Sequence, residues 1–109
     1  MLLVDQDSGR HGVFAPFFGA PASTIPTPAE LALRTGATIL TGASVRVGPG
    51  FRYAGEFEPP VDVRDTGDHA ADLLRITTEI NARIEGVIRR APEQWLWSHR
   101  RWKTKPPTA

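Results

Sequence analysis

Two acidic residues near the start of the sequence have the type and position that an α/β enzyme uses in its site. Asp5 and Asp7 follow the apolar run Met1–Val4 and precede Ser8 and Gly9, which predicts a buried strand ending in a polar loop. In open α/β sheets, ligands bind beyond the carboxyl ends of the strands. The two carboxylates could orient a base, hold an acceptor hydroxyl or bind a divalent ion. The alternative is a loop whose aspartates bond the backbone.

Other reactive side chains give less support for catalysis. The general-base candidates near neutral pH are His11, His69 and His99, and none has an acid at a recognisable spacing. We expect them to be structural or exposed. The chain has no cysteine, no G-x-S-x-G elbow and no glycine-rich phosphate loop. We therefore expect no metal ion and no cofactor.

The segment 92–103, P-E-Q-W-L-W-S-H-R-R-W-K, contains every tryptophan of the chain. From residue 89 onward there are six Lys or Arg and one acid, which favours an anionic partner. Three readings stay open: a structural cap on the core, a patch facing lipid headgroups, and nucleic-acid binding. The cap and the lipid patch are weighted ahead of nucleic acid. The candidate contact residues are Trp95, Arg100, Arg101, Trp102 and Lys103.

Three phenylalanines fall within five positions of the segment Gly12–Gly19. Pro16 predicts that this segment is a sheet edge or a shaped loop rather than a central strand. Phe14, Phe17 and Phe18 must be buried or must line an apolar surface. Core packing is the simpler interpretation, and contact with an acyl chain is the sharper one.

The remaining pattern predicts an α/β domain. Thr27, Pro28 and Glu30 predict a helix start with a capping box, and Gly36 predicts its end. Ala37–Leu40 predicts a short buried strand. Period-two alternation predicts a hairpin over residues 44–57, with Gly48-Pro49-Gly50 as its turn.

The longest predicted helix runs from Asp65 to Ala91, capped by Thr66 or Asp68. Its apolar stripe faces the sheet, and Pro92 ends it. We expect residues 104–109 to form a frayed tail. The stripe consists of Leu73, Ile76, Ile80, Ile84 and Val87.

Length and composition set the outer limits. At 109 residues with a net charge of +1, the chain is one domain at most and carries no global electrostatic signal. No apolar run reaches the ~18 residues that a membrane-spanning helix needs, and the sequence does not show the basic-then-apolar pattern that is typical of a secretion leader.

Residues 4–24, V-D-Q-D-S-G-R-H-G-V-F-A-P-F-F-G-A-P-A-S-T, contain D-x-D, then G-V-F-x-P-F-F-G, then P-A-x-T. In these motifs the stretch resembles the bacterial lipid A biosynthesis acyltransferases. Residues 92–103 resemble the family's C-terminal segment. A-L-R-T-G-A at 32–37 and I-T-T-E-I-N at 76–81 fit the spacing, so the resemblance covers nearly the whole chain.

The resemblance implies a partial glycerolipid-acyltransferase-like sheet with flanking helices, a long C-terminal helix and a Trp-rich cap. It implies acyl transfer from acyl carrier protein or coenzyme A to a glycolipid hydroxyl, at the cytoplasmic face of the bacterial inner membrane. The family's base is a His in H-x-x-x-x-D/E. Here the acid position after each histidine holds Pro16, Leu74 or Thr104, so the motif is absent. We therefore expect residues 1–109 to be the C-terminal part of one acyltransferase domain, inactive alone.

By resemblance, Asp5 and Asp7 fall at an acidic, acceptor-handling motif, and Arg46 is a candidate contact to phosphate or headgroup. Phe14, Phe17 and Phe18 would wall the acyl path. The basic residues of the segment 92–103 would meet lipid phosphate or the acidic carrier protein. The rival hypothesis is a small, non-enzymatic binding module whose basic Trp-rich tail binds an anionic lipid or protein.

Overall fold

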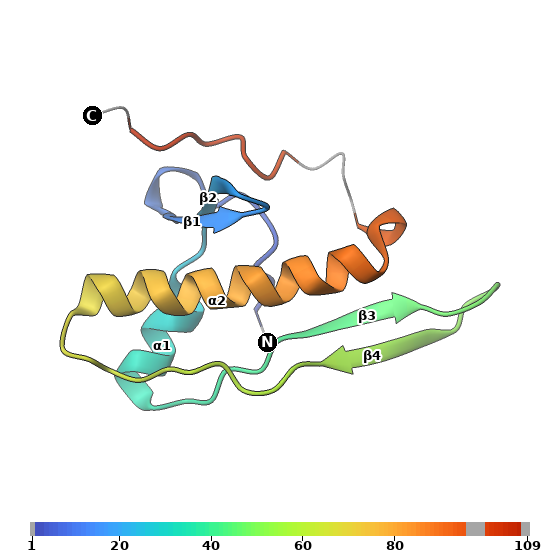
Figure 1. Ribbon diagram of the computed structural model, residues 1–109, viewed down its shortest axis with the longest axis horizontal. Coiled ribbons are helices and arrows are strands. Elements are labelled where there is room, and N and C mark those ends of the chain that lie inside the picture. The colour runs from blue at the N-terminus through green and yellow to red at the C-terminus, as the bar shows by residue number, and fades with distance from the viewer. Residues whose placement is uncertain (1, 96–99, 108–109) are drawn as a thin grey trace.

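The computed structural model describes residues 2–95 and 100–107, and it is an α/β arrangement of two small antiparallel sheets and two helices (Figure 1). The long helix α2 passes between the hairpin β1–β2 on one side and α1 on the other. The elements in chain order are the 3-10 helix η1 Gly9–His11, β1 Val13–Phe17, β2 Ala20–Thr24, α1 Thr27–Thr35, β3 Gly42–Arg46, β4 Tyr53–Phe57, α2 His69–Arg90 and the 3-10 helix η2 Pro92–Gln94.

The first sheet is a tight hairpin whose turn consists of Phe18 and Gly19. Both residues have positive φ, at 50° and 80°, as a two-residue turn of the primed type requires. The Phe18 N–H donates to Glu85 Oε1 on α2 at 2.6 Å, which holds this unusual conformation against the helix. Pro16 pairs with Pro21 across the strands, a pairing that needs no N–H donor from either residue. The segment is thus an edge strand, as Pro16 predicts.

Helix α1 ends as predicted but begins differently. Gly36, at φ 73°, adopts the left-handed conformation, and its N–H donates to Ala32 O at 2.9 Å. The predicted capping box is wrong. Thr27 already lies inside the helix, so the capping position falls to Pro26, whose carbonyl accepts from the Glu30 N–H at 3.0 Å. Pro28 lies in the first turn, where its missing N–H costs nothing.

Two predicted strands, Met1–Val4 and Ala37–Leu40, are absent from the described residues. Val4 and Ile39 pack against the core, whereas Leu3 and Leu40 are exposed. The Thr41 carbonyl accepts from the Glu58 N–H, and the Ile39 carbonyl accepts from the Val61 N–H, both at 3.0 Å. The segment Ala37–Leu40 therefore extends the β3–β4 pairing with irregular hydrogen bonds and is not a strand. An apolar run becomes a central strand only when strands flank it on both sides, and here both sheets have two strands.

The second hairpin, β3–β4, confirms the prediction over residues 44–57. Gly42 pairs with Phe57 and Arg46 with Tyr53. The Phe57 ring lies over Gly42. A side chain at position 42 would clash with this ring, since its Cβ would lie 2.7 Å from two ring carbons. Tyr53 and Phe57 lie on the same face of β4, as the period-two alternation requires, and both are exposed.

Helix α2 carries the core on two of its faces. Asp68 caps it by accepting from the Ala71 N–H at 3.1 Å, while Thr66 donates to Asp72 instead. Ile76 and Ile80 pack with Ala29 of α1. Ile88, further along the helix, packs with Phe17 of the first hairpin. No helix in the described ranges has both the length and the apolar character to cross a membrane.

Truncating the centre of this core tests the packing. Ile76 is fully buried, so Ile76→Ala should lower the free energy of unfolding by about 2–5 kcal/mol. Leu74→Ala, on an exposed position of the same helix, should cost less than about 1 kcal/mol. Urea unfolding followed by circular dichroism measures both. Equal losses would contradict this assignment of the core.

Candidate functional site

Asp7 joins the beginning of the chain to its end. Its Oδ2 accepts from the Thr104 N–H at 2.9 Å, and its Oδ1 accepts from Thr104 Oγ1 at 2.8 Å and from the Gly9 N–H at 2.9 Å. The structure therefore differs from the expectation of a frayed tail that begins at residue 104. Residues 105–107 are exposed coil, and residues 108–109 lie outside the described part of the chain.

Arg101 lies fully buried between the C-terminal segment and the first hairpin. Its Nη1 donates to Ser23 O at 2.6 Å and its Nη2 donates to Thr24 Oγ1 at 2.7 Å. The guanidinium also lies over the Phe17 ring, 5.3 Å from its centre. Asn81 of α2 donates to the same Thr24 hydroxyl at 3.2 Å. Helix, hairpin and tail therefore share one polar contact.

Burial and hydrogen bonding act in opposite directions on this pair of charges. Burial raises the pKa of Asp7, but the hydrogen bonds from Thr104 and Gly9 and the charge of Arg101 lower it more, so that the pKa lies below its ordinary value. Burial lowers the pKa of Arg101, while the charges of Asp7 and Asp5 act in the opposite direction. Burial has the larger effect, so the pKa of Arg101 lies below its ordinary value, and the two aspartates offset only part of the cost of burying the guanidinium.

The tryptophans of the tail that the structure describes are partly buried and pack against the core. Phe17 is their common partner: its ring centre lies 5.7 Å from that of Trp95 and 5.6 Å from that of Trp102. Phe18 stands edge-on to Phe17 at 4.8 Å. Of the three interpretations of this segment, these two rings fit the structural cap. Trp97 lies outside the described residues.

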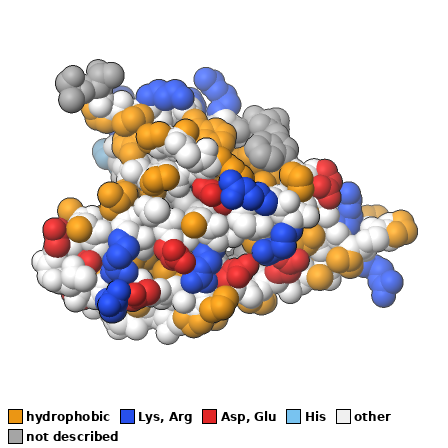
Figure 2. All heavy atoms as spheres, in the orientation of Figure 1, with side chains coloured by type: hydrophobic (Ala, Val, Ile, Leu, Met, Phe, Trp, Pro, Cys, Tyr) orange, Lys and Arg blue, Asp and Glu red, His pale blue; other side chains and the backbone are white. Residues whose placement is uncertain are grey.

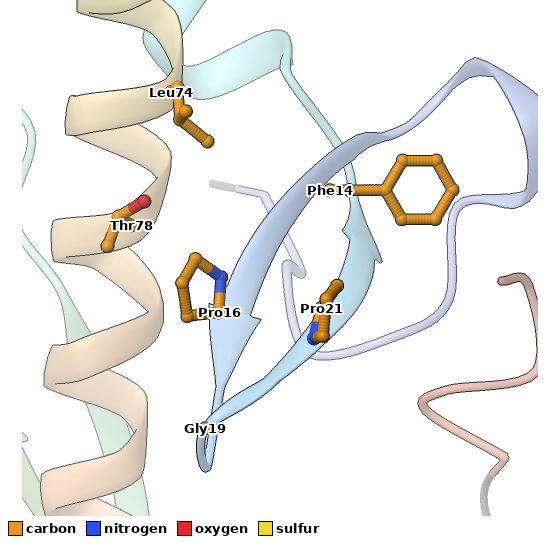
Figure 3. A pocket seen from close by; sticks show the side chains of 6 residues that line it. All are labelled: Phe14, Pro16, Gly19, Pro21, Leu74 and Thr78. Atoms are coloured by element: carbon orange, nitrogen blue, oxygen red, sulfur yellow. The ribbon is translucent and has the colours of Figure 1, made fainter. Parts of the chain in front are cut away.

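The three candidate phenylalanines lie in different surroundings. Phe14 contributes to a groove of about 370 Å³ between the first hairpin and the start of α2 (Figure 3). Phe17 is fully buried, and Phe18 packs beneath Arg89, whose guanidinium carbon lies 4.9 Å from the ring centre. The other lining residues are Pro16, Gly19, Pro21, Leu74 and Thr78.

The remaining candidate residues are spread over the surface. Asp5 is partly exposed, and Arg100 and Lys103 are exposed on either side of the buried Arg101. Arg46 lies on the second sheet, where its N–H donates to Gln94 Oε1 at 2.7 Å and its carbonyl accepts from Gln94 Nε2 at 2.9 Å. In the described part of the chain, no three His, Asp or Glu side chains converge as metal ligands.

Four residues of the polar contact were not predicted as site residues from the sequence: Ser23, Thr24, Asn81 and Thr104. A signal for the first three existed, because they lie in the stretches P-A-S-T and I-T-T-E-I-N that carry the resemblance. Their role needed the structure, since Thr24 meets a guanidinium 77 positions later.

Because Arg101 is buried and Arg100 is exposed, we expect substitutions of these two neighbours to differ in their effect on the free energy of unfolding. Lysine lacks the planar fork that reaches Ser23 and Thr24 together, so Arg101→Lys should lower the free energy of unfolding by about 2–3 kcal/mol. Arg100→Lys, the same change at an exposed position, should alter it by less than about 0.5 kcal/mol. Chemical unfolding measures both. Matching effects would show that the buried contact is not formed in solution.

Asp7 also predicts a pH dependence. Because its pKa is lower in the folded than in the unfolded protein, its contribution is complete above the unfolded pKa and is lost as the pH falls through the folded pKa. Asp7→Asn should therefore be less stable near neutral pH and lose less stability on acidification below about pH 5. The pKa of Asp72 is also lowered, by hydrogen bonds from Thr66, so a smaller slope should persist.

Unfolding measured across the acid range tests this prediction. Glu93→Gln, which removes an exposed carboxylate on η2, is the control and should follow the unsubstituted protein. An Asp7→Asn curve parallel to that of the control would contradict the role of Asp7.

The chain is similar to known proteins over nearly its whole length. Residues 1–104 match the family described as bacterial lipid A biosynthesis acyltransferase. The chain is 38% identical over 104 residues to the lipid A biosynthesis palmitoleoyltransferase of Escherichia coli strain K12, covering 94% of this chain and 32% of that protein. It is 33% identical over 109 residues to the lipid A biosynthesis lauroyltransferase of the same strain, covering 94% and 33%. The chain thus spans about a third of the length of these relatives. It belongs to the bacterial lipid A biosynthesis acyltransferase family.

Proposed function

We propose that this chain supplies part of an enzyme that transfers a fatty acyl chain from acyl carrier protein or coenzyme A to a hydroxyl of a glycolipid, such as a lipid A precursor. The observation that carries the proposal is the family match over residues 1–104, with relatives named as palmitoleoyl- and lauroyltransferases. We propose that the reaction takes place at the cytoplasmic face of the bacterial inner membrane.

The reaction needs a base that this chain does not provide in the family's form. The acceptor hydroxyl oxygen attacks the thioester carbonyl, an ester bond forms, the thiol leaves, and the hydroxyl proton passes to the base. The family's H-x-x-x-x-D/E motif does not occur in the sequence. We propose that residues 1–109 act together with a segment that carries this motif, and that they are inactive alone.

The polar contact around Arg101 supports different roles for the two aspartates. Asp7 is bonded to Gly9 and Thr104, so we propose that it positions the loop. Asp5 is partly exposed, and we propose that its carboxylate contacts the acceptor. The groove that Phe14 lines is walled mainly by apolar side chains, which suits an acyl chain. Arg46 remains a candidate contact to phosphate.

The tail offers a smaller basic surface than its sequence suggests. Arg100 and Lys103 are exposed, whereas Arg101 is buried. We propose that the two exposed residues contact lipid phosphate or the acidic carrier protein. The aromatic cap beneath them fixes the segment in place, so this contact would need little ordering of the chain.

A chimera tests the proposal in a complete enzyme. In the E. coli palmitoleoyltransferase, the matched region would be replaced by residues 1–104 of this chain. The chimera should transfer an acyl group to a lipid A precursor, and the isolated chain should not. Product formation is measured by mass spectrometry. A folded but inactive chimera, or turnover by the isolated chain, would contradict the proposal.

Within the chimera, Asp5→Asn should lower kcat/KM by at least about tenfold if the carboxylate contacts the acceptor in the transition state. Asp65→Asn, an exposed aspartate before α2, is the matched control and should leave the rate unchanged. Equal rates for the two variants would remove Asp5 from the site.

A further inference from the structure

The far end of the second hairpin presents large apolar side chains to solvent. Phe51 is 96% exposed, Tyr53 61% and Val47 45%. In Figure 1 the tip of β3–β4 extends past the end of α2, away from the rest of the molecule. Isolated exposed apolar residues need no explanation, but three within seven positions at a projecting tip indicate a contact surface.

Basic residues are interleaved with these apolar ones, and acidic residues are not. Arg46 and Arg52 flank the turn and are exposed. No Asp or Glu occurs between Glu30 and Glu56. Figure 2 shows hydrophobic and basic side chains together on this projecting end. The hairpin tip, defined here as residues 46–53, is therefore an apolar surface with a positive rim.

Local backbone geometry sets the turn at the end of the tip, and one contact anchors its base. Gly48 and Gly50 have φ of 68° and 92°, and Pro49 between them restricts the backbone further. A side chain at either glycine would meet open space, so no tertiary contact requires these glycines. At the base of the tip, Gln94 bonds both backbone groups of Arg46, which anchors the hairpin to η2. The turn and this anchor together keep Val47, Phe51 and Tyr53 facing solvent.

We infer that the hairpin tip is a docking surface for an anionic lipid bilayer, with Phe51 entering the interface while Arg46 and Arg52 contact lipid phosphates. Aromatic rings prefer the headgroup region, and basic residues gain from the negative surface potential. The charge pattern complements an anionic surface, whereas a purely apolar protein partner would leave two arginines unpaired. This surface lies on the second hairpin, whereas Arg100 and Lys103 lie in the tail, which contacts the first hairpin. The inference does not depend on acyl transfer.

Sedimentation with vesicles tests the role of the charges. The full chain should bind vesicles of phosphatidylcholine with phosphatidylglycerol more strongly than phosphatidylcholine alone, and less strongly at high salt. Arg46→Gln with Arg52→Gln should lower this binding by at least about tenfold. Arg10→Gln with Arg34→Gln, which removes the same charge from exposed positions elsewhere, should lower it much less. Equal losses would overturn the inference, because binding would then follow net charge alone.

Insertion of the ring is tested separately. The chain has no cysteine, so Phe51→Cys accepts a single environment-sensitive fluorophore. Its emission should shift to shorter wavelength on anionic vesicles, whereas the same label on Arg34→Cys should not shift. An unshifted label at position 51 would overturn the inference even where a charge variant fails to fold.

The tail provides the competing outcome. Loss of binding in Arg100→Gln with Lys103→Gln, together with full binding by the tip variant, would overturn the inference and assign the bilayer contact to the tail. Vesicle binding and acyl transfer are separate readouts. An inactive chimera would leave the hairpin assignment standing, and absent vesicle binding would leave the acyl-transfer proposal standing.

Discussion

The buried guanidinium of Arg101 is the constraint on which the rest of the arrangement depends. A charged group inside a protein is tolerated only when its donors are paired and opposite charge lies near. Ser23 and Thr24 each accept a hydrogen bond from a terminal nitrogen, the Phe17 ring covers one face, and the charges of Asp7 and Asp5 offset part of the cost of burial. Any conformation that moves the tail from the first hairpin must leave this charge without its partners.

This constraint links segments at opposite ends of the sequence. Thr104 bonds Asp7 across 97 positions, and Asn81 joins α2 to the same contact through Thr24. The loop that carries Asp5 is therefore positioned by the last residues of the chain as much as by its own neighbours. The tail, whose composition suggests an appended binding segment, instead completes the surroundings of the acidic loop. A substitution in the tail would therefore displace the loop that carries Asp5, although the substituted residue does not contact the substrate.

Features decided within a few residues could be predicted from the sequence. Gly36 ends α1, Asp68 caps α2, and Gly48-Pro49-Gly50 turns the second hairpin, because each depends on local backbone geometry. The runs Met1–Val4 and Ala37–Leu40 were wrongly predicted as strands, since a strand also needs neighbours that no local pattern specifies. The family could be recognised early because its motifs are contiguous in the sequence, whereas the contacts among them are not.

The arginines show the same limit at the level of single residues. Arg100 and Arg101 are adjacent and chemically identical, yet one is exposed and the other fully buried. Only the direction of each side chain relative to Phe17 and Thr24 distinguishes them, and that direction is set by long-range packing.

Aromatic residues divide in a similar way between the two ends of the molecule. Trp95 and Trp102 occur in a basic segment and pack against Phe17, whereas Phe51 and Tyr53 occur in an equally basic segment and face solvent. A segment rich in aromatic and basic residues can therefore contact either the core of the protein or an external surface, and its composition does not distinguish the two. In the tail, the packing of both tryptophan rings against Phe17 and the hydrogen bonds of Arg101 to Ser23 and Thr24 direct these side chains inward. At the hairpin tip, the glycine–proline turn leaves Phe51 and Tyr53 facing solvent.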